Sequence, residues 1–175
     1  INREPEHRRI YDYVFDTPPG EQMLIDFGEQ TLSKTKSIHF ICLLLRYSRF
    51  LCVYAQDHKY NSEEACKAIY RSFCRLGGRP KELVIDNLKA FVEKPRKSAD
   101  DKALLNSKFE EFCKDYGITP MPCMPYRPET KGKTETQNKI IDQLKNYNGH
   151  YSGLPDIHDK LEKINSEDNE RPSQA

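Results

Sequence analysis

The segment EQMLIDFG, residues 21–28, decides the fold because it is apolar on both faces of an extended chain. Its apolar side chains occupy odd and even positions alike: Met23, Leu24, Ile25 and Phe27. A strand that is apolar on both sides is typical of the middle of a sheet whose two faces are covered. We therefore predict a central strand at residues 21–28, interrupted by a single carboxylate at Asp26.

Two further strand-like segments follow. Residues 36–46 and 49–55 are rich in β-branched, aromatic and leucine side chains, and only Tyr47 and Ser48 separate them. A link this short joins antiparallel strands. The two segments are therefore predicted to form a hairpin.

Helical and extended segments alternate downstream of the hairpin. Apolar residues recur at helical spacing in residues 62–76, with Ser62 as the predicted N-cap and Gly77 and Gly78 as the end of the helix. The later predicted elements are a strand at 82–86, a surface segment at 87–101 with one apolar patch at 90–92 followed by a charged loop, a helix at 104–116, a brief strand at 118–121, a helix at 131–147 and an edge or linker helix containing Ile157, Leu161 and Ile164. This order predicts an α/β fold with a mixed sheet and helices on both faces.

Composition and charge exclude several classes of protein. The chain has 175 residues, a one-domain length, and its 28 Lys and Arg residues almost balance 27 Asp and Glu residues, for a net charge of +1. This balance excludes a histone-like polycation, although residues 21–147 carry 22 basic against 17 acidic side chains. No apolar run approaches the roughly 20 residues of a membrane span. The six cysteines lack zinc-ligand spacing and are predicted to be free thiols.

Two carboxylates lie where apolar strand residues are expected. Asp26 interrupts LIDF and Asp86 closes VIDN, so an ionised carboxylate in either place has to be compensated. The structural alternatives are backbone hydrogen bonds to Asp26 and an Asx-type turn at Asp86. If the two strands are neighbours, the carboxylates repel each other unless a divalent cation lies between them. We therefore predict that Asp26 and Asp86 bind Mg²⁺, which prefers oxygen ligands.

A site for two Mg²⁺ ions requires a third acidic ligand. Glu135 is the best candidate, because it lies on the predicted helix 131–147, which a proline-rich segment can bring back across the strand ends. Glu129 is the competitor, although it precedes the point at which a regular helix can begin. Lys139 lies one turn beyond Glu135, and an ordinary surface ion pair between the two is the alternative interpretation.

Three further polar residues were considered for chemistry. Asn87 directly follows Asp86 and is predicted either to orient substrate or to cap the turn after the strand, with the cap favoured. His39 lies in a hairpin strand and His58 in a polar turn, and neither is predicted to be catalytic. The pair Gly77-Gly78 lacks the Lys-Ser or Lys-Thr of a P-loop, so nucleotide hydrolysis is not predicted.

Three motifs carry a resemblance to a known family. PGEQMLIDFGE (residues 19–29), VIDNLKA (84–90) and KGKTE (131–135) resemble segments of DDE transposases and retroviral integrases, and most closely those of IstA-type bacterial insertion-sequence transposases. The resemblance covers about residues 18–170. The 48 residues between Asp86 and Glu135 favour the bacterial group over the retroviral pattern.

The resemblance implies an RNase H-like fold, with a five-stranded mixed sheet of strand order 3-2-1-4-5 and helices on both faces. It implies that Asp26, Asp86 and Glu135 are the catalytic triad and hold two Mg²⁺ ions, for which Mn²⁺ can substitute. For the full protein it implies an N-terminal helix-turn-helix region, a C-terminal β-rich domain, a AAA+ ATPase helper and a homo-oligomer on DNA. Residues 1–20 are accordingly expected to be a linker, residues 21–147 the integrase-type catalytic core, and residues 148–175 a C-terminal helix or linker.

The predicted function is Mg²⁺-dependent cleavage at transposon ends and transfer of their 3′-hydroxyls into target DNA, in the bacterial cytoplasm and at the nucleoid. Lys131, Lys133 and Lys139 are predicted to contact phosphates near the cut. Arg127 is predicted to line the DNA path, with a turn-packing role equally open. The alternatives are an RNase H-like nuclease and a non-catalytic DNA-binding or assembly module.

Overall fold

The computed structural model describes residues 17–33, 36–95, 101–123 and 154–170. The strands are β1 (Gln22–Ser33), β2 (Lys36–Leu45), β3 (Leu51–Gln56), β4 (Glu82–Ile85), β5 (Val92–Lys94), β6 (Leu104–Leu105) and β7 (Thr119–Pro122). The helices are α1 (Ser62–Leu76), α2 (Ser107–Asp115) and α4 (Leu154–Glu170). None of the helices within these ranges is long and apolar enough to cross a lipid bilayer.

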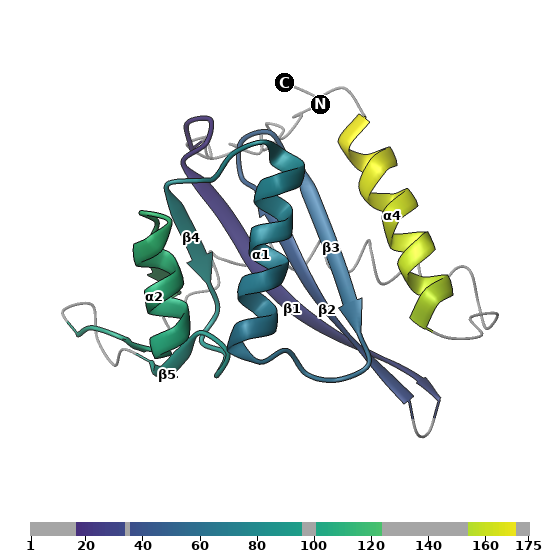
Figure 1. Cartoon of the computed structure of the whole chain (residues 1–175), viewed down its shortest axis with the longest axis horizontal. Coiled ribbons are helices and arrows are strands. Elements are labelled where there is room, and N and C mark those ends of the chain that lie inside the picture. Colours follow the sequence, from purple (N-terminus) through teal and green to yellow (C-terminus); the bar gives the residue numbers. More distant parts are fainter. Residues whose placement is uncertain (1–16, 34–35, 96–100, 124–153, 171–175) are drawn as a thin grey trace, which may run out of the picture.

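Five strands form one mixed sheet in the order β3-β2-β1-β4-β7, with β1 in the middle (Figure 1). β1 pairs antiparallel with β2 and parallel with β4, and β4 pairs parallel with β7. The predicted strand order 3-2-1-4-5 is confirmed, with β7 as the fifth strand of the sheet, because β5 and β6 pair only with each other. The central position predicted for residues 21–28 is confirmed as well.

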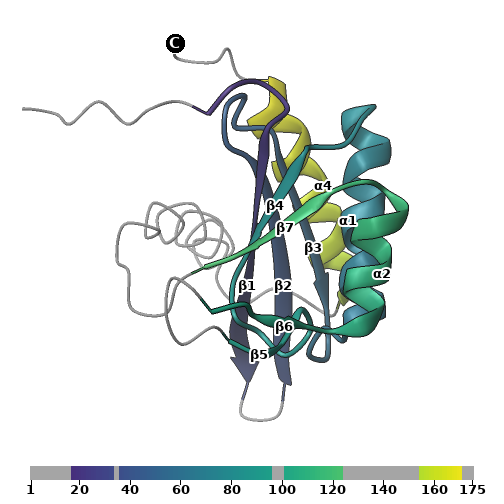
Figure 2. The same ribbon diagram turned by 90° about the vertical axis from the view of Figure 1, so that its left-hand side faces the viewer.

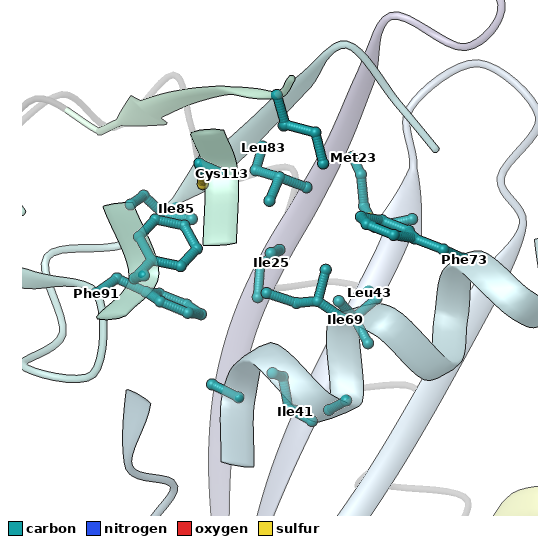
Figure 3. Close-up of a cluster of buried hydrophobic side chains, with 14 of the residues drawn as sticks. Met23, Ile25, Ile41, Leu43, Ile69, Phe73, Leu83, Ile85, Phe91 and Cys113 are labelled. Atoms are coloured by element: carbon teal, nitrogen blue, oxygen red, sulfur yellow. The ribbon is translucent and has the colours of Figure 1, made fainter. Parts of the chain in front are cut away.

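The main core lies between the sheet and the helices α1 and α2 (Figures 1 and 2). Alternate residues of the sheet point into it, and Ile25, Ile41 and Ile85 are completely buried. Figure 3 shows these side chains converging with Phe73 of α1 and Cys113 of α2. Burial on this scale contributes about 1.5–3 kcal/mol for each large apolar side chain.

The opposite face of the sheet is covered by α4 over β2 and β3. Ile157, Leu161 and Ile164, the residues that predicted a weak helix, are at most 4% exposed and pack against these strands. The predicted edge or linker helix therefore forms, and it belongs to a second apolar core. The half of this face formed by β1 and β4 carries Asp26 and Asp86.

Helix α4 also satisfies the free backbone edge of β3. Asn165 accepts a hydrogen bond from the amide of Val53 at 2.9 Å and donates to its carbonyl at 3.1 Å. Asn169 does the same at Leu51, at 2.7 Å and 2.8 Å. Four helical residues rise about 6 Å and two strand residues about 6.6 Å, so the two asparagines match alternate residues of the strand. They occupy the backbone groups to which another strand could bind.

Prolines limit hydrogen bonding at the opposite edge of the sheet. Thr119 donates its amide hydrogen to the carbonyl of Lys81, and Cys123 donates to that of Ile85, so alternate residues of β7 face β4. Pro120 and Pro122 fall between them, and their nitrogens face away from the sheet without a hydrogen to donate. Prolines of this kind are found on edge strands and hinder the addition of another strand.

Three predicted element boundaries shift by a few residues. The N-cap of α1 is Asn61 and not Ser62, because Asn61 and Glu64 form a reciprocal capping box, while the Ser62 hydroxyl donates to Asn106. β3 begins at Leu51 and not at residue 49, because Arg49 takes a left-handed conformation with φ of 60°. β1 extends to Ser33, beyond the predicted end at residue 28.

The predicted surface loop at residues 87–101 is wrong in its first half. Phe91 is completely buried and Val92 is 2% exposed. The ring of Phe91 lies 4.4 Å from that of Phe109 and 5.3 Å from that of Phe27, measured between centroids. β5 then pairs with β6, and α2 starts after Asn106, its N-cap, and not at the predicted residue 104. The short apolar patch at residues 90–92, which has no helical or strand periodicity, is therefore held in the core by aromatic contacts with residues distant in sequence.

Asn165→Ala should destabilise the fold by about 2–6 kcal/mol, because the amide and carbonyl of Val53 both lose their partner and each buried unpaired group costs about 1–3 kcal/mol. Urea unfolding would measure the loss. Ser166→Ala is the control, since this exposed serine donates only to the carbonyl of Glu162, and its effect should stay below about 0.5 kcal/mol. Equal losses for the two variants would contradict the proposed role of the asparagine.

His58 should make the stability of the N-terminal end of α1 depend on pH. The pKa of His58 is raised by its hydrogen bonds to Glu64 and Asp57, both 2.8 Å long. Because the pKa of His58 is higher in the folded state than in the unfolded state, protonation of His58 stabilises the fold. This stabilisation is fully present below the unfolded-state pKa of about 6.5 and is lost as the pH rises through the folded-state pKa. The stability difference between wild type and His58→Ala should therefore be larger at pH 6 than at pH 9. Lys59→Ala, which removes a neighbouring exposed cation, should show no such pH dependence.

Candidate active site

Asp26 and Asp86 occupy equivalent positions on neighbouring strands. Ile25 of β1 is paired with Ile85 of β4 in parallel register, and each aspartate is the next residue. Because side chains alternate along a strand, burial of the two isoleucines against the helices directs both aspartates to the opposite face. Parallel neighbours lie about 4.8 Å apart. The register therefore places the two carboxylates side by side on the half of the sheet beside α4.

Each aspartate accepts one hydrogen bond from the amide that follows it. The amide of Phe27 donates to Oδ1 of Asp26 at 3.0 Å, and the amide of Asn87 donates to Oδ1 of Asp86 at 2.7 Å. The backbone hydrogen bond considered for Asp26 therefore occurs. At Asp86 the donor is the next residue, and not the second residue along that an Asx-type turn requires. Both hydrogen bonds are local. They fix one oxygen of each carboxylate, which is compatible with cation binding by the carboxylate.

A buried thiol lies beside Asp26 in the sheet. Cys42 is the register partner of Asp26 on β2. The pKa of its thiol is raised to about 12, mainly by burial and to a smaller extent by the negative charge of Asp26. The thiol is therefore neutral at physiological pH and is no candidate nucleophile. None of the six cysteines, all within the described residues, forms a disulfide, as predicted.

Asn87 connects the end of β4 to the end of β7. Its Nδ2 donates to the carbonyl of Cys123 at 3.1 Å, and the amide of Cys123 donates to the carbonyl of Ile85 at 2.9 Å. The Oδ1 atom of Asn87 is buried and has no hydrogen-bond partner among the residues that the structure describes. Such an atom costs about 1–3 kcal/mol. The side chain therefore links two strands, whereas the sequence had favoured a local cap.

The other predicted site residues lie outside the described residues and stay predictions: Glu135, its competitor Glu129, Lys131, Lys133, Lys139 and Arg127. Across the described ranges, no group of three His, Cys, Asp or Glu side chains could hold a metal ion. Asp26 and Asp86 alone form a pair of adjacent hard oxygen ligands, which fits Mg²⁺ but needs a further ligand from elsewhere in the chain.

His39 and His58 lie away from the aspartate pair, which agrees with the prediction that neither is catalytic. His39 is on β2 two residues before Ile41, which places it on the face covered by α1 and α2. Its Nδ1 lies 3.8 Å from Oε2 of Glu29. His58 is bound by carboxylates at the start of α1. A cavity of about 370 Å³ opens between α1, β3 and α4, and neither aspartate lines it. Asp86 is exposed and Asp26 is partly exposed in the described part of the chain, so neither carboxylate is enclosed in that cavity.

Residues 16–128 match the family described as Integrase core domain. The chain belongs to this family. The matched segment of the integrase core includes Asp26 and Asp86 and ends before Glu135. The sequence-based assignment to the DDE transposase and integrase class of polynucleotidyl transferases is confirmed at the level of the family.

Several curated relatives of this integrase core are transposases of insertion sequences. The chain is 32% identical over 94% of its length to the transposase for insertion sequence element IS232 from Bacillus thuringiensis subsp. berliner, of which it spans 41%. It is 29% identical over 78% of its length to the transposase for an IS21-like element from Bacteroides fragilis, of which it spans 26%. The chain thus spans less than half of either relative.

Solved integrases share the fold. The HTLV-2 integrase catalytic core domain in complex with magnesium matches 83% of this chain and 86% of that one, with a TM-score of 0.60 at 21% identity. A chain of the simian T-cell lymphotropic virus intasome matches 90% of this chain and 56% of that one, with a TM-score of 0.63 at 17% identity. The predicted RNase H-like fold is confirmed by this similarity and by the strand order.

Asp86→Asn should stabilise the metal-free protein by about 1 kcal/mol, because it removes repulsion between two adjacent carboxylates near the surface. Urea unfolding in EDTA would measure the gain. Adding MgCl₂ should stabilise the wild type and have a much smaller effect on the variant, since a ligand that binds only the folded state raises its stability. Glu111→Gln removes an exposed carboxylate on α2 and should leave the response to Mg²⁺ unchanged. A variant that responds to Mg²⁺ like the wild type would contradict the assignment of Asp86.

Proposed function

We propose that this chain is the catalytic domain of a DNA transposase that cuts transposon ends and joins their 3′-hydroxyls to target DNA. The observation that carries the proposal is the pair Asp26 and Asp86, each of which directly follows one of the register partners Ile25 and Ile85 on parallel central strands of an integrase core. The names of the curated relatives support the choice of substrate.

Asp26 and Asp86 bind Mg²⁺, with Glu135 as the third ligand. When bound, two such ions supply Lewis-acid stabilisation of the attacking and leaving oxygens in an in-line displacement at phosphorus. The magnesium complex of the HTLV-2 integrase core supports this choice of ion. Mn²⁺, which also accepts oxygen ligands, substitutes.

The protein's own contribution is to hold rigid ligands and position the DNA. Asp26 lies within a strand that is hydrogen-bonded on both sides, so its backbone position is fixed before substrate binds. No side chain is needed as a covalent nucleophile, because the DNA hydroxyl or water attacks directly. Lys131, Lys133, Lys139 and Arg127 contact phosphates, which positions DNA without reading its sequence. The excess of basic side chains in residues 21–147 supports this role.

The chain acts as part of a larger protein in the bacterial cytoplasm. Residues 1–20 connect it to an N-terminal DNA-binding region, residues 21–147 are the catalytic core, and residues 148–175 lead toward a C-terminal domain. A AAA+ ATPase helper directs target choice, and several copies assemble on DNA. The greater length of the transposase relatives supports this organisation.

Asp26→Asn, Asp86→Asn and Glu135→Gln should each lower strand transfer at least about 10³-fold, because each loses several kcal/mol of metal-assisted stabilisation. The assay uses the longest protein that the gene encodes, DNA carrying the element's ends, and Mg²⁺. Glu111→Gln is the matched control and should retain activity.

The products decide between the proposal and its alternatives. Joined strands support a transposase, whereas hydrolysis without joining would indicate an RNase H-like nuclease. Full strand transfer by the Asp86→Asn variant would refute the assignment of the site. DNA binding by a protein that binds no Mg²⁺ or Mn²⁺ would indicate a non-catalytic module.

A further inference from the structure

The residues on both sides of Asp86 are hydrogen-bonded to Cys123, the residue that directly follows β7. The residue before Asp86, Ile85, accepts a hydrogen bond from the amide of Cys123 at 2.9 Å. The residue after it, Asn87, donates from Nδ2 to the carbonyl of Cys123 at 3.1 Å. Both backbone hydrogen-bonding groups of Cys123 are therefore directed at the residues that flank the carboxylate.

The second of these bonds extends the link between the strands beyond their regular pairing. β4 ends at Ile85, where its last register partner is Pro122 of β7, so Asp86 and Asn87 lie beyond the ladder. Asp26 needs no such support, because it lies within β1 and is paired with Cys42 of β2. Of the two aspartates, Asp86 alone is at a strand end.

Asn87 also contacts Asp86 directly. Its backbone amide donates to Oδ1 of Asp86 at 2.7 Å, so the orientation of that amide determines where the carboxylate points. The side-chain bond to Cys123 fixes the position of residue 87 and therefore the direction of this amide. One residue thus connects the carboxylate to β7 through two hydrogen bonds.

We propose that Asn87 is a positioning residue for Asp86. Asn87 anchors the turn after β4 to Cys123 and thereby orients the carboxylate of Asp86 for a divalent cation. The inference rests on the proposed function, because it assumes that Asp86 is a cation ligand.

The test is the affinity of the 175-residue chain for Mn²⁺ alone, measured from the electron paramagnetic resonance signal of the free ion. Asn87→Ala should raise the Kd about 10-fold, the lower end of the effect of residues that orient metal ligands. Asn87→Ser, which is too short to reach Cys123, should weaken binding similarly and serves if the alanine variant fails to fold.

Asn61→Ala is the matched control for stability. It removes the N-cap of α1, far along the chain from the aspartates, and should lower the melting temperature without changing the Kd for Mn²⁺. If Asn87 has a purely structural role, Asn87→Ala and Asn61→Ala should each change Mn²⁺ binding only in proportion to the stability that each variant loses. That result would overturn the inference, as would a wild-type Kd in Asn87→Ala.

Asp86→Asn separates this inference from the proposed function. If it weakens Mn²⁺ binding while Asn87→Ala does not, the cation site stands and the positioning role falls. If Asp86→Asn binds Mn²⁺ as the wild type does, the cation site and the inference both fall. Weakened binding in both variants, with an unchanged Kd in Asn61→Ala, supports the inference.

Discussion

The parallel pairing of β1 with β4 is the contact on which the rest of the structure depends. It places Ile25 opposite Ile85, and both are completely buried under the helices. Because strand side chains alternate, this burial leaves the next residue of each strand on the other face. A slip of one residue would carry a carboxylate into the apolar core. The energy that stabilises the sheet therefore also maintains the register of Asp26 and Asp86.

The two faces of the sheet have different tasks. The face under α1 and α2 is a continuous apolar core, and Phe91 joins it directly after the turn that carries Asp86 and Asn87 (Figure 3). The other face is divided, with α4 covering β2 and β3 while the aspartates lie on β1 and β4. Close packing on one side thus supports the two carboxylates on the other.

Local patterns predicted most of the fold, and long-range contacts account for the errors. The apolar run around Asp26 and the helical spacing of Ile157, Leu161 and Ile164 were sufficient for a central strand and a helix. The burial of Phe91 depends on Phe27 and Phe109, which are distant in sequence, and no periodicity signals it. The bond from Asn87 to Cys123 was missed for the same reason, because it joins strand ends 36 residues apart. For the site, the sequence predicted that Asp26 and Asp86 lie on neighbouring strands, and the register of Ile25 with Ile85 agrees with this. Their role as cation ligands stays a prediction, as does that of Glu135, which lies outside the described residues.

The closure of the sheet at both edges restricts how this domain can recognise other proteins. At β3 the amides of Asn165 and Asn169 occupy the backbone, and at β7 two prolines lack the hydrogen that an added strand would need. Recognition by β-augmentation, in which a peptide extends a sheet, is therefore disfavoured at both edges of the described sheet. Other proteins that contact the described sheet are therefore expected to do so through side chains and not through its backbone edges. Such contacts are specified by surface residues, so related domains can diverge in assembly while keeping the same sheet.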